Sequence, residues 1–192
     1  AMSQKSSEMK AQGIDVINMS VGEPDFMTPD HVKEAGKKAI DDNFSKYSPV
    51  PGYPALREAI SKKLKDENNL DYAASEIIVG TGGKQGVCNA VLALVNPGDE
   101  VIIPAPYWVS YPQMVKLAGG VPVVVSAGIE QDFKITAEQL EEAITPKTKI
   151  IILCSPSNPT GSVYSAEELE ALSKVVLAHE DVFVLSDEIY EH

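Results

Sequence analysis

The sequence alternates between short runs of β-branched, apolar residues and longer segments with apolar residues at helical spacing. The runs are the candidate strands, at Ile77–Val79, Val101–Ile103, Val121–Val125, Ile150–Leu153 and Val182–Leu185. Most of them are continuously apolar, which is typical of strands covered on both faces. This alternation of strands and helices predicts an α/β fold with a doubly wound, mostly parallel sheet.

Two of the helical segments begin with the pattern of a capping box. Ser165 is followed by Glu168, and Thr136 is followed by Gln139, each just before an apolar stripe. A further helix is expected after Gly80-Thr81-Gly82-Gly83-Lys84, through about Val95. Each of these helices follows or precedes a candidate strand, as the α/β prediction requires.

The first part of the chain has a different pattern. Ser3–Gln12 predicts a helix and Val16–Met19 a strand. Thr28-Pro29 combines a capping residue with a proline at the first helical position, so a helix is expected through about Asp41. Phe44–Pro54 is rich in Pro, Tyr and Ser and is expected to be an irregular loop.

Charge and composition exclude several classes of function. The 192 residues carry a formal net charge of −12, and the Lys and Arg residues are not clustered, which argues against a nucleic-acid partner. No apolar run is long enough to span a bilayer and Ala1–Ile14 does not resemble a signal peptide, so we expect no membrane association and a cytoplasmic location.

The two cysteines, Cys88 and Cys154, both lie in apolar surroundings in the sequence. They are interpreted as small buried side chains in a reducing compartment. No metal site is expected, because the three histidines show no ligand spacing with either cysteine or with each other.

Four candidate sites lie just after candidate strands, at the edge of an α/β sheet where ligands bind. Gly80-Thr81-Gly82-Gly83-Lys84 precedes a helix, and its glycines either form a simple turn or let helix N–H groups approach a phosphate. The pattern is neither a Walker A loop nor GxGxxG, which disfavours nucleoside triphosphates and NAD. Trp108 is either a partly buried core residue or a stacking surface for a flat aromatic ligand.

The other two candidates are an amide and a carboxylate. Asn158 either bonds its own backbone in a proline-rich turn or donates to a phenolate oxygen. Asp187 follows a buried strand and needs a partner, because burying a lone carboxylate is costly. A pyridinium nitrogen would be such a partner, and the ion pair would make the ring an effective electron sink. The alternatives are that Asp187 caps the next segment or pairs with a lysine.

The ordered set of motifs resembles the class I aminotransferases that use pyridoxal 5′-phosphate, especially the aspartate aminotransferase branch. The resemblance covers nearly all of the chain. Its motifs are Val21-Gly22-Glu23-Pro24-Asp25-Phe26, Lys46-Tyr47-Ser48-Pro49, Gly82-Gly83-Lys84-Gln85, Pro106-Tyr107-Trp108-Val109-Ser110-Tyr111-Pro112, Ser157-Asn158-Pro159-Thr160-Gly161 and Ser186-Asp187-Glu188-Ile189-Tyr190.

The resemblance implies a role for each of several residues. The N–H groups of Gly83 and Lys84 would hold the cofactor phosphate, and Tyr47 would reach the phosphate of the neighbouring subunit in a homodimer. Trp108 would stack on the pyridine ring, Asp187 would pair with its nitrogen, and the side chains of Asn158 and Tyr190 would bond its phenolic oxygen. The substrate would be contacted by Gly22, Lys84, Trp108 and Asn158.

The implied function is transamination between an amino acid, with aspartate expected, and a 2-oxo acid such as 2-oxoglutarate, within amino acid metabolism. Lys84 favours dicarboxylic substrates, because its ammonium could meet a second carboxylate. The alternatives are a pyridoxal-phosphate-dependent lyase, an aromatic or prephenate-type aminotransferase, and a non-catalytic aminotransferase-like protein.

The family also has a Schiff-base lysine, and no lysine here has the matching context. We therefore expect the chain to be the N-terminal half of a transaminase, with a truncated version of the family's large domain and no catalytic residue, and to be inactive alone. Residues 1–30 are assigned to the N-terminal segment of the small domain. Residues 31–192 are assigned to the N-terminal part of the large, cofactor-binding domain.

Overall fold

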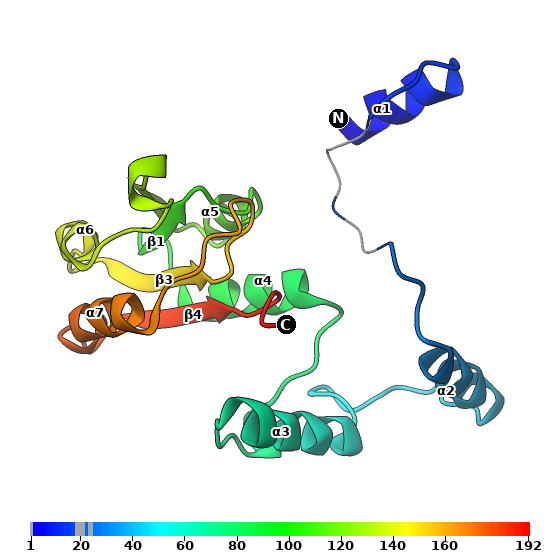
Figure 1. The fold of residues 1–192 in the computed structure, drawn as a ribbon. Helices are drawn as coiled ribbons and strands as arrows, with labels where there is room; N and C mark the ends of the chain where they lie inside the picture. Colours follow the sequence, from blue (N-terminus) through cyan, green and yellow to red (C-terminus); the bar gives the residue numbers. More distant parts are fainter. Residues whose placement is uncertain (1, 18–21, 23–24) are drawn as a thin grey trace. The chain divides into compact units, whose positions relative to one another are not determined.

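A parallel sheet of four strands lies at the centre of residues 49–192 in the computed structural model (Figure 1). The structure describes residues 2–17, 22 and 25–192. Contacts divide the chain into two units, residues 1–48 and 49–192. This division does not test the predicted assignment to small and large domains, which stays a prediction.

The sheet has the strand order β2-β1-β3-β4, and every neighbouring pair is parallel. Its strands are β1 (Glu100–Ala105), β2 (Val121–Ser126), β3 (Thr148–Cys154) and β4 (Phe183–Asp187). The predicted α/β fold with a doubly wound parallel sheet is confirmed, and four of the five candidate strands are present.

Helices cover both faces of the sheet. They are α4 (Gly83–Leu94), α5 (Tyr111–Leu117), α6 (Ala137–Ala143) and α7 (Ala166–Leu177), with the short 3₁₀ helix η2 at Ile129–Gln131. On the face covered by α4 and α5, Val101 and Ile103 of β1 pack with Val91 and Val115. Because side chains alternate along a strand, Ile102 points to the opposite face.

That opposite face is covered by α6 and α7. Ile102 and Ile151 pack there with Leu140, Leu172 and Tyr164. Full burial of one such aliphatic side chain contributes about 1.5–3 kcal/mol, so the two clusters hold the helices on the sheet. Because all four strands are parallel, their carboxyl ends lie at the same edge of the sheet.

The two predicted capping boxes are confirmed. Thr136 Oγ1 accepts from the N–H of Gln139 at 3.3 Å, while Gln139 Oε1 accepts from the N–H of Thr136 at 2.9 Å. The same reciprocal pair joins Ser165 and Glu168, at 3.2 and 2.7 Å. These bonds satisfy N–H groups that have no partner inside their helices.

The prediction of a strand at Ile77–Val79 is wrong. These residues follow the 3₁₀ helix η1 (Ala74–Glu76) in extended but unpaired backbone, and the side chain of Ile78 is 76% exposed. The N–H of Val79 donates to the carbonyl oxygen of Pro51 at 3.0 Å. A β-strand requires a neighbouring strand that hydrogen-bonds to it along its length. Within residues 49–192, no strand pairs in this way with Ile77–Val79.

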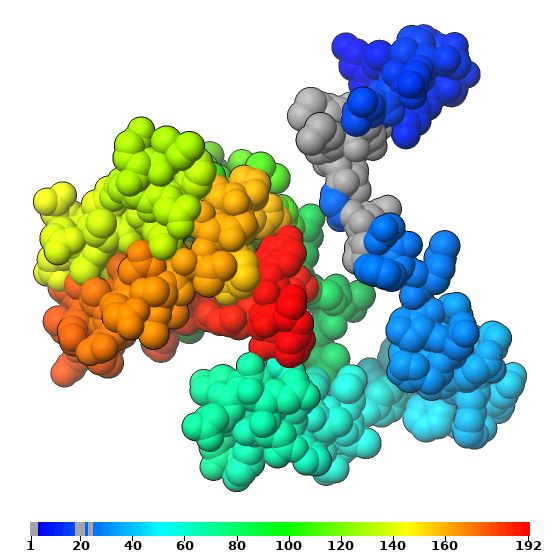
Figure 2. Space-filling view, viewed as in Figure 1, coloured from blue at the N-terminus to red at the C-terminus, as the bar shows by residue number. Residues whose placement is uncertain are grey.

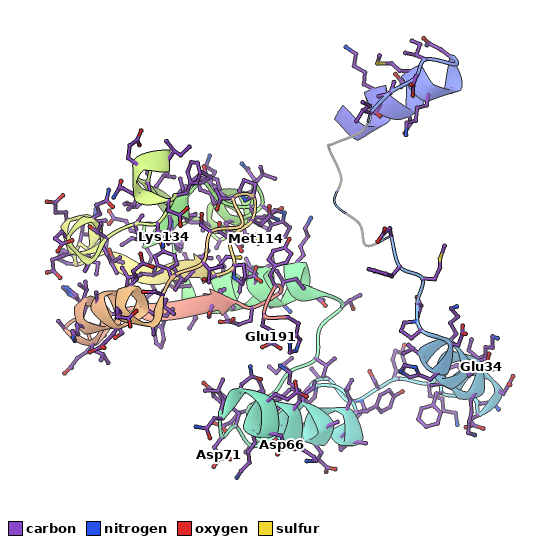
Figure 3. The ribbon with its side chains drawn as sticks, in the orientation of Figure 1. Glu34, Asp66, Asp71, Met114, Lys134 and Glu191 are labelled. Carbon is purple, nitrogen blue, oxygen red and sulfur yellow. The ribbon has the colours of Figure 1, made fainter. Side chains whose placement is uncertain are left out.

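Helix α3 (Pro54–Asn68) and the last residues of the chain are connected by polar contacts. Figure 2 shows the C-terminal residues beside α3, and Figure 3 labels Glu191, which is one of these residues. The carboxylate of Glu191 pairs with Lys63 and accepts from Asn68 Nδ2 at 2.8 Å. These contacts fix the segment that follows β4.

In the first unit, the predicted helices are present as α1 (Met2–Ala11) and α2 (Asp30–Asp41). Pro29 was predicted to be the first helical residue, but it occupies the N-cap position of α2. The helix therefore begins one residue later than predicted, at Asp30. Val16 and Ile17 have no regular structure, and the rest of the predicted strand Val16–Met19 lies outside the described residues. Among the described ranges, no helix is both long and apolar enough to cross a membrane.

Candidate active site

Polar side chains gather where three neighbouring strands end. Ala105, Cys154 and Asp187 are the last residues of β1, β3 and β4, and Cys154 pairs in register with Asp187. In open parallel sheets ligands bind at this edge. The structure thus brings together the segments that the sequence analysis selected from distant parts of the chain.

Asp187 is the partly buried carboxylate of this edge. Its Oδ2 accepts from the phenol of Tyr111 at 2.7 Å, and its Oδ1 accepts from the N–H of Ile189 at 3.3 Å. Within the described ranges, no Lys, Arg or His nitrogen lies within 4.0 Å of this carboxylate. The structure therefore disfavours the alternative in which Asp187 pairs with a lysine.

Tyr111 and Cys154 lie next to this carboxylate and stay uncharged near neutral pH. Burial, together with the hydrogen bond to Asp187, raises the pKa of the Tyr111 phenol far above its ordinary value. Burial also raises the pKa of the Cys154 thiol, whose Sγ donates to the carbonyl oxygen of Pro156 at 3.2 Å. Both cysteines of the chain are free and half-buried.

Asn158 and Tyr190 come together from two different loops. The side-chain amide of Asn158 donates to the phenolic oxygen of Tyr190 at 3.3 Å. Asn158 lies in the turn after β3, where the N–H of Ser157 bonds the carbonyl oxygen of Ser162 at 3.0 Å. Tyr190 lies three residues after Asp187 and is 44% exposed. Two polar groups thus converge beside the carboxylate, and a single oxygen atom of a ligand could accept from both.

Trp108 lies between this cluster and the start of α4. Its ring packs edge-on against Tyr111, with ring centroids 5.4 Å apart and an interplanar angle of 86°. The ammonium of Lys84 lies 5.0 Å from the centroid of the Trp108 ring, within cation–π range. Trp108 is therefore a partly buried ring that also belongs to the edge of the site.

The N-terminus of α4 can accept an anion at close range. Gly82 has φ +86°, in the region that favours glycine, and a Cβ added at Gly82 or Gly83 would meet no atom within 4 Å. The first N–H groups of α4 have no partner inside the helix and carry its positive dipole end. The N–H of Thr81 is held by the side-chain carbonyl of Gln85, which fixes the turn before the helix.

Two predicted site residues belong to the first unit. Tyr47 is fully exposed, and Gly22 is exposed with open space around its Cα. The neighbours Val21, Glu23 and Pro24 lie outside the described residues. The roles of Gly22 and Tyr47 stay predictions, as do the individual roles of the other site residues.

Tyr111 lies at the site but was not predicted from the sequence to be a site residue. Tyr111 was part of a quoted motif but had no assigned role, and its 2.7 Å contact with Asp187 spans 76 residues of sequence. A signal was available, since Tyr111 follows Trp108 by three residues and opens a helix immediately after a ligand-edge loop. Cys154 was interpreted only as a small buried side chain, although it ends a strand at the same edge.

Comparison with known proteins gives a consistent result. Residues 14–192 match the family model described as aminotransferase class I and II. The chain is 58% identical over 192 residues to a probable aspartate/prephenate aminotransferase of Rickettsia bellii, and 56% identical to an aspartate/prephenate aminotransferase of Cereibacter sphaeroides. Each match covers 100% of this chain but only 48% of the relative. The chain thus spans about half the length of the curated relatives it matches.

Solved structures agree with these relatives. The aspartate aminotransferase of Rhizobium meliloti superposes with a TM-score of 0.95 at 46% identity, covering 100% of this chain and 48% of that one. The aspartate aminotransferase of Thermus thermophilus with maleate gives a TM-score of 0.95 at 48% identity, covering 99% of this chain and 50% of that one. On its motifs, its fold and the match over residues 14–192, the chain belongs to the aminotransferase class I and II family.

Proposed function

We propose that this chain supplies much of the cofactor cradle of a pyridoxal 5′-phosphate-dependent aminotransferase. The observation that carries the proposal is the carboxylate of Asp187, which is partly buried at the ligand edge and has no cationic side chain within 4.0 Å in the described ranges. A buried carboxylate without such a partner is costly, and a protonated pyridine nitrogen would compensate it. Membership of the aminotransferase family supports this reading.

The chemistry of the surrounding groups fits this cofactor. Asp187 would pair with the ring nitrogen, and Asn158 and Tyr190, which already lie 3.3 Å apart, would bond its phenolic oxygen. Trp108 would stack on the ring, and the N–H groups of Gly83 and Lys84 at the start of α4 would hold the phosphate. When bound, pyridoxal phosphate supplies an electron-withdrawing ring for chemistry at the α-carbon of an amino acid.

The role of Asp187 in that chemistry is electrostatic. Its negative charge favours a proton on the nitrogen of the ring, and a positively charged ring withdraws electrons more strongly. Asn158 and Tyr190 would orient the ring by bonding the oxygen on its other side. Orientation of this kind places the reacting carbon of the amino acid at a fixed distance from the groups that move its proton.

For the substrates, we infer an amino acid and a 2-oxo acid, with aspartate and 2-oxoglutarate as the pair. The relatives are named aspartate or aspartate/prephenate aminotransferases, so prephenate is a second candidate. The specific feature that favours a dicarboxylic substrate is Lys84, whose ammonium lies over the Trp108 ring at the edge of the site. Gly22, Trp108 and Asn158 would contribute the other substrate contacts.

We further propose that the active protein is a cytoplasmic homodimer in which Tyr47 reaches the phosphate of the partner's site. The residue that anchors the cofactor covalently would be a lysine in the part of the relatives that this chain does not span. In that arrangement these 192 residues alone would bind cofactor weakly and would not turn over. A lyase, or a non-catalytic protein with the same cradle, would differ in the products formed from the bound amino acid.

The proposal is tested with the protein made from its complete natural reading frame, beside the 192-residue chain. Each is incubated with pyridoxal phosphate, reduced with borohydride, mapped by peptide, and assayed for conversion of aspartate and 2-oxoglutarate to oxaloacetate and glutamate. We expect one adduct on a lysine outside these 192 residues, turnover by the complete protein, and a loss of about 100-fold or more in Asp187→Ala. Steady turnover by the 192-residue chain, with one stoichiometric adduct on its own lysine, would contradict it.

A further inference from the structure

The phenol of Tyr111 donates to the carboxylate of Asp187 at the ligand edge, and no role is assigned to this contact above. The Tyr111 oxygen lies 2.7 Å from Asp187 Oδ2, and the Tyr111 side chain is only 3% exposed. We propose that Tyr111 is a positioning residue that holds Asp187 Oδ2, so that the carboxylate faces the ring nitrogen of a bound pyridine ligand. The inference rests on the proposed function, because it requires a pyridine ligand at Asp187.

Tyr111 is itself held in place from two sides. Its backbone N–H donates to the carbonyl oxygen of Trp108 at 3.1 Å, at the point where α5 begins. Its ring packs edge-on against Trp108 and lies in the core formed by α4, α5 and the sheet. A phenol fixed in this way can restrict the rotation of the carboxylate to which it donates.

Tyr111 is the one side-chain donor to Asp187 among residues 49–192. The other donor is the backbone N–H of Ile189, which bonds Oδ1 at 3.3 Å. The acidic neighbour Glu188 is bonded to the hydroxyl of Ser186, and Cys154 carries a neutral thiol. Because the pKa of Tyr111 is raised by burial and by Asp187, the phenol keeps its proton throughout the neutral range and remains a donor.

The test uses the cofactor-free protein made from the complete natural reading frame and pyridoxamine 5′-phosphate, which has the pyridine ring but cannot form a Schiff base with lysine. Its dissociation constant is measured by fluorescence for wild type, Tyr111→Phe, Asp187→Asn and the double variant. A second probe is the analogue in which a C–H group replaces the ring nitrogen. The matched control is Tyr164→Phe, because Tyr164 is also buried but accepts from Ile135 N–H on the opposite face of the sheet.

We expect Tyr111→Phe to weaken pyridoxamine phosphate binding by about tenfold, the scale of one hydrogen bond to a charged group. The same substitution should leave the affinity of the carbon analogue unchanged, and it should have no further effect in the Asp187→Asn background. Tyr164→Phe should change neither affinity. An equal loss for both probes, or a full effect in the Asp187→Asn background, would mean that Tyr111 acts only on packing and would overturn the inference.

The outcomes also separate this inference from the proposed function. If Asp187→Asn weakens binding and Tyr111→Phe does not, the positioning role alone is wrong. If wild type and Asp187→Asn bind the probe equally, or neither binds it, the assigned role of Asp187 fails and the positioning role fails with it.

A ligand-free NMR measurement tests the contact itself: the hydroxyl proton of Tyr111 should exchange slowly in wild type and quickly in Asp187→Ala. Fast exchange in wild type would overturn the inference directly.

Discussion

The side-chain amide of Asn158 donates to the phenolic oxygen of Tyr190, 32 residues further along the chain, at 3.3 Å. The bond joins the turn after β3 to the segment after β4, on the side of the sheet edge where Asp187 lies. A long bond between neutral groups contributes little to folding, since typical net values are about 0.5–1.5 kcal/mol. Its placement suits two groups that share a ligand oxygen.

Removing the Tyr190 hydroxyl should therefore affect ligand binding more than folding. We expect Tyr190→Phe to raise the dissociation constant of pyridoxamine phosphate by about two- to tenfold, the range of one neutral hydrogen bond. The melting temperature should change little, because Tyr190 is 44% exposed. Tyr72→Phe serves as the control, since it removes another partly exposed phenol, 48% accessible, that lies between α3 and η1. An equal effect of both variants on binding would argue against a ligand contact at Tyr190.

Lys84 provides a test of substrate choice in the complete protein. Its ammonium lies 5.0 Å from the centre of the Trp108 ring, where the side-chain carboxylate of a dicarboxylic substrate could meet it. Lys84→Ala should lower kcat/KM for aspartate by about tenfold more than kcat/KM for an uncharged amino acid, the scale of one charge-assisted bond. Lys147→Ala removes an exposed lysine in the loop before β3 and should affect both substrates little. Equal losses for both substrates would assign Lys84 to the phosphate or to the fold.

Much of the sheet and the capping boxes could be predicted from the sequence because their causes are local. Continuous apolar runs mark strands covered on both faces, and Ser165 with Glu168 forms a helix start within four residues. Ile77–Val79 has the same local pattern but no pairing strand in the described residues, so the pattern alone misassigned it. Pairing depends on distant parts of a chain, which local patterns do not record.

The same distinction applies to the candidate site. Asp187 and Asn158 were identified because each follows an apolar run of strand-forming residues, which is visible in the sequence itself. The contact of Tyr111 with Asp187 depends on how β1 and β4 are placed within the sheet, and no local pattern contains that information. Only the three-dimensional structure shows that Tyr111 donates a hydrogen bond to the carboxylate of Asp187.

The interaction of Glu168 with Lys134 makes stability depend on pH. The backbone N–H of Ser165, and then the ammonium of Lys134 at 2.9 Å, lower the pKa of Glu168 below its ordinary value of 4.5. A carboxyl group with a lowered pKa in the folded state stabilises the fold above its unfolded pKa, and this stabilisation is lost as the pH falls through its folded pKa. Figure 3 labels Lys134, whose partner Glu168 lies in the first turn of α7.

We therefore expect Glu168→Gln to lower the melting temperature at pH 7, and this difference should shrink as the pH falls through the lowered folded-state pKa of Glu168. Thermal unfolding followed by circular dichroism across this pH range measures the difference. Glu180→Gln, which changes an exposed carboxylate after α7, should give a curve parallel to wild type. A pH-independent difference between Glu168→Gln and wild type would contradict the linkage to Glu168.

Gly120 precedes β2 at a point where the backbone approaches the core closely. A Cβ at this position would lie 2.6 Å from Val95 Cγ1 and 3.1 Å from Val115 Cγ1. Gly120→Ala should therefore destabilise the fold by about 1–3 kcal/mol through overpacking. Gly86→Ala is the matched control: it lies within α4 with open space around it, and it should stabilise by about 0.5–1 kcal/mol. Urea unfolding of both variants measures these changes, and equal signs would contradict the packing argument.

The exposed apolar residues of β4 predict self-association of the 192-residue chain. β4 is an edge strand, and the side chains of Phe183 and Val184 are 46% and 49% exposed. Val184 also lines an apolar groove with Leu169, Leu172 and Val176 of α7. Unpaired strand edges and exposed apolar surface of this kind tend to bind other chains.

Sedimentation velocity should therefore show a concentration-dependent increase in mass for the 192-residue chain. Val184→Lys places a charge on the edge strand and in the groove, so it should shift the distribution toward monomer at the same concentration. Val50→Lys is the control, because Val50 is 97% exposed in the loop before α3 and far in sequence from β4. If both variants associate as wild type does, the edge of β4 is not the contact; if wild type stays monomeric at every concentration, the exposed face is tolerated and the prediction is wrong.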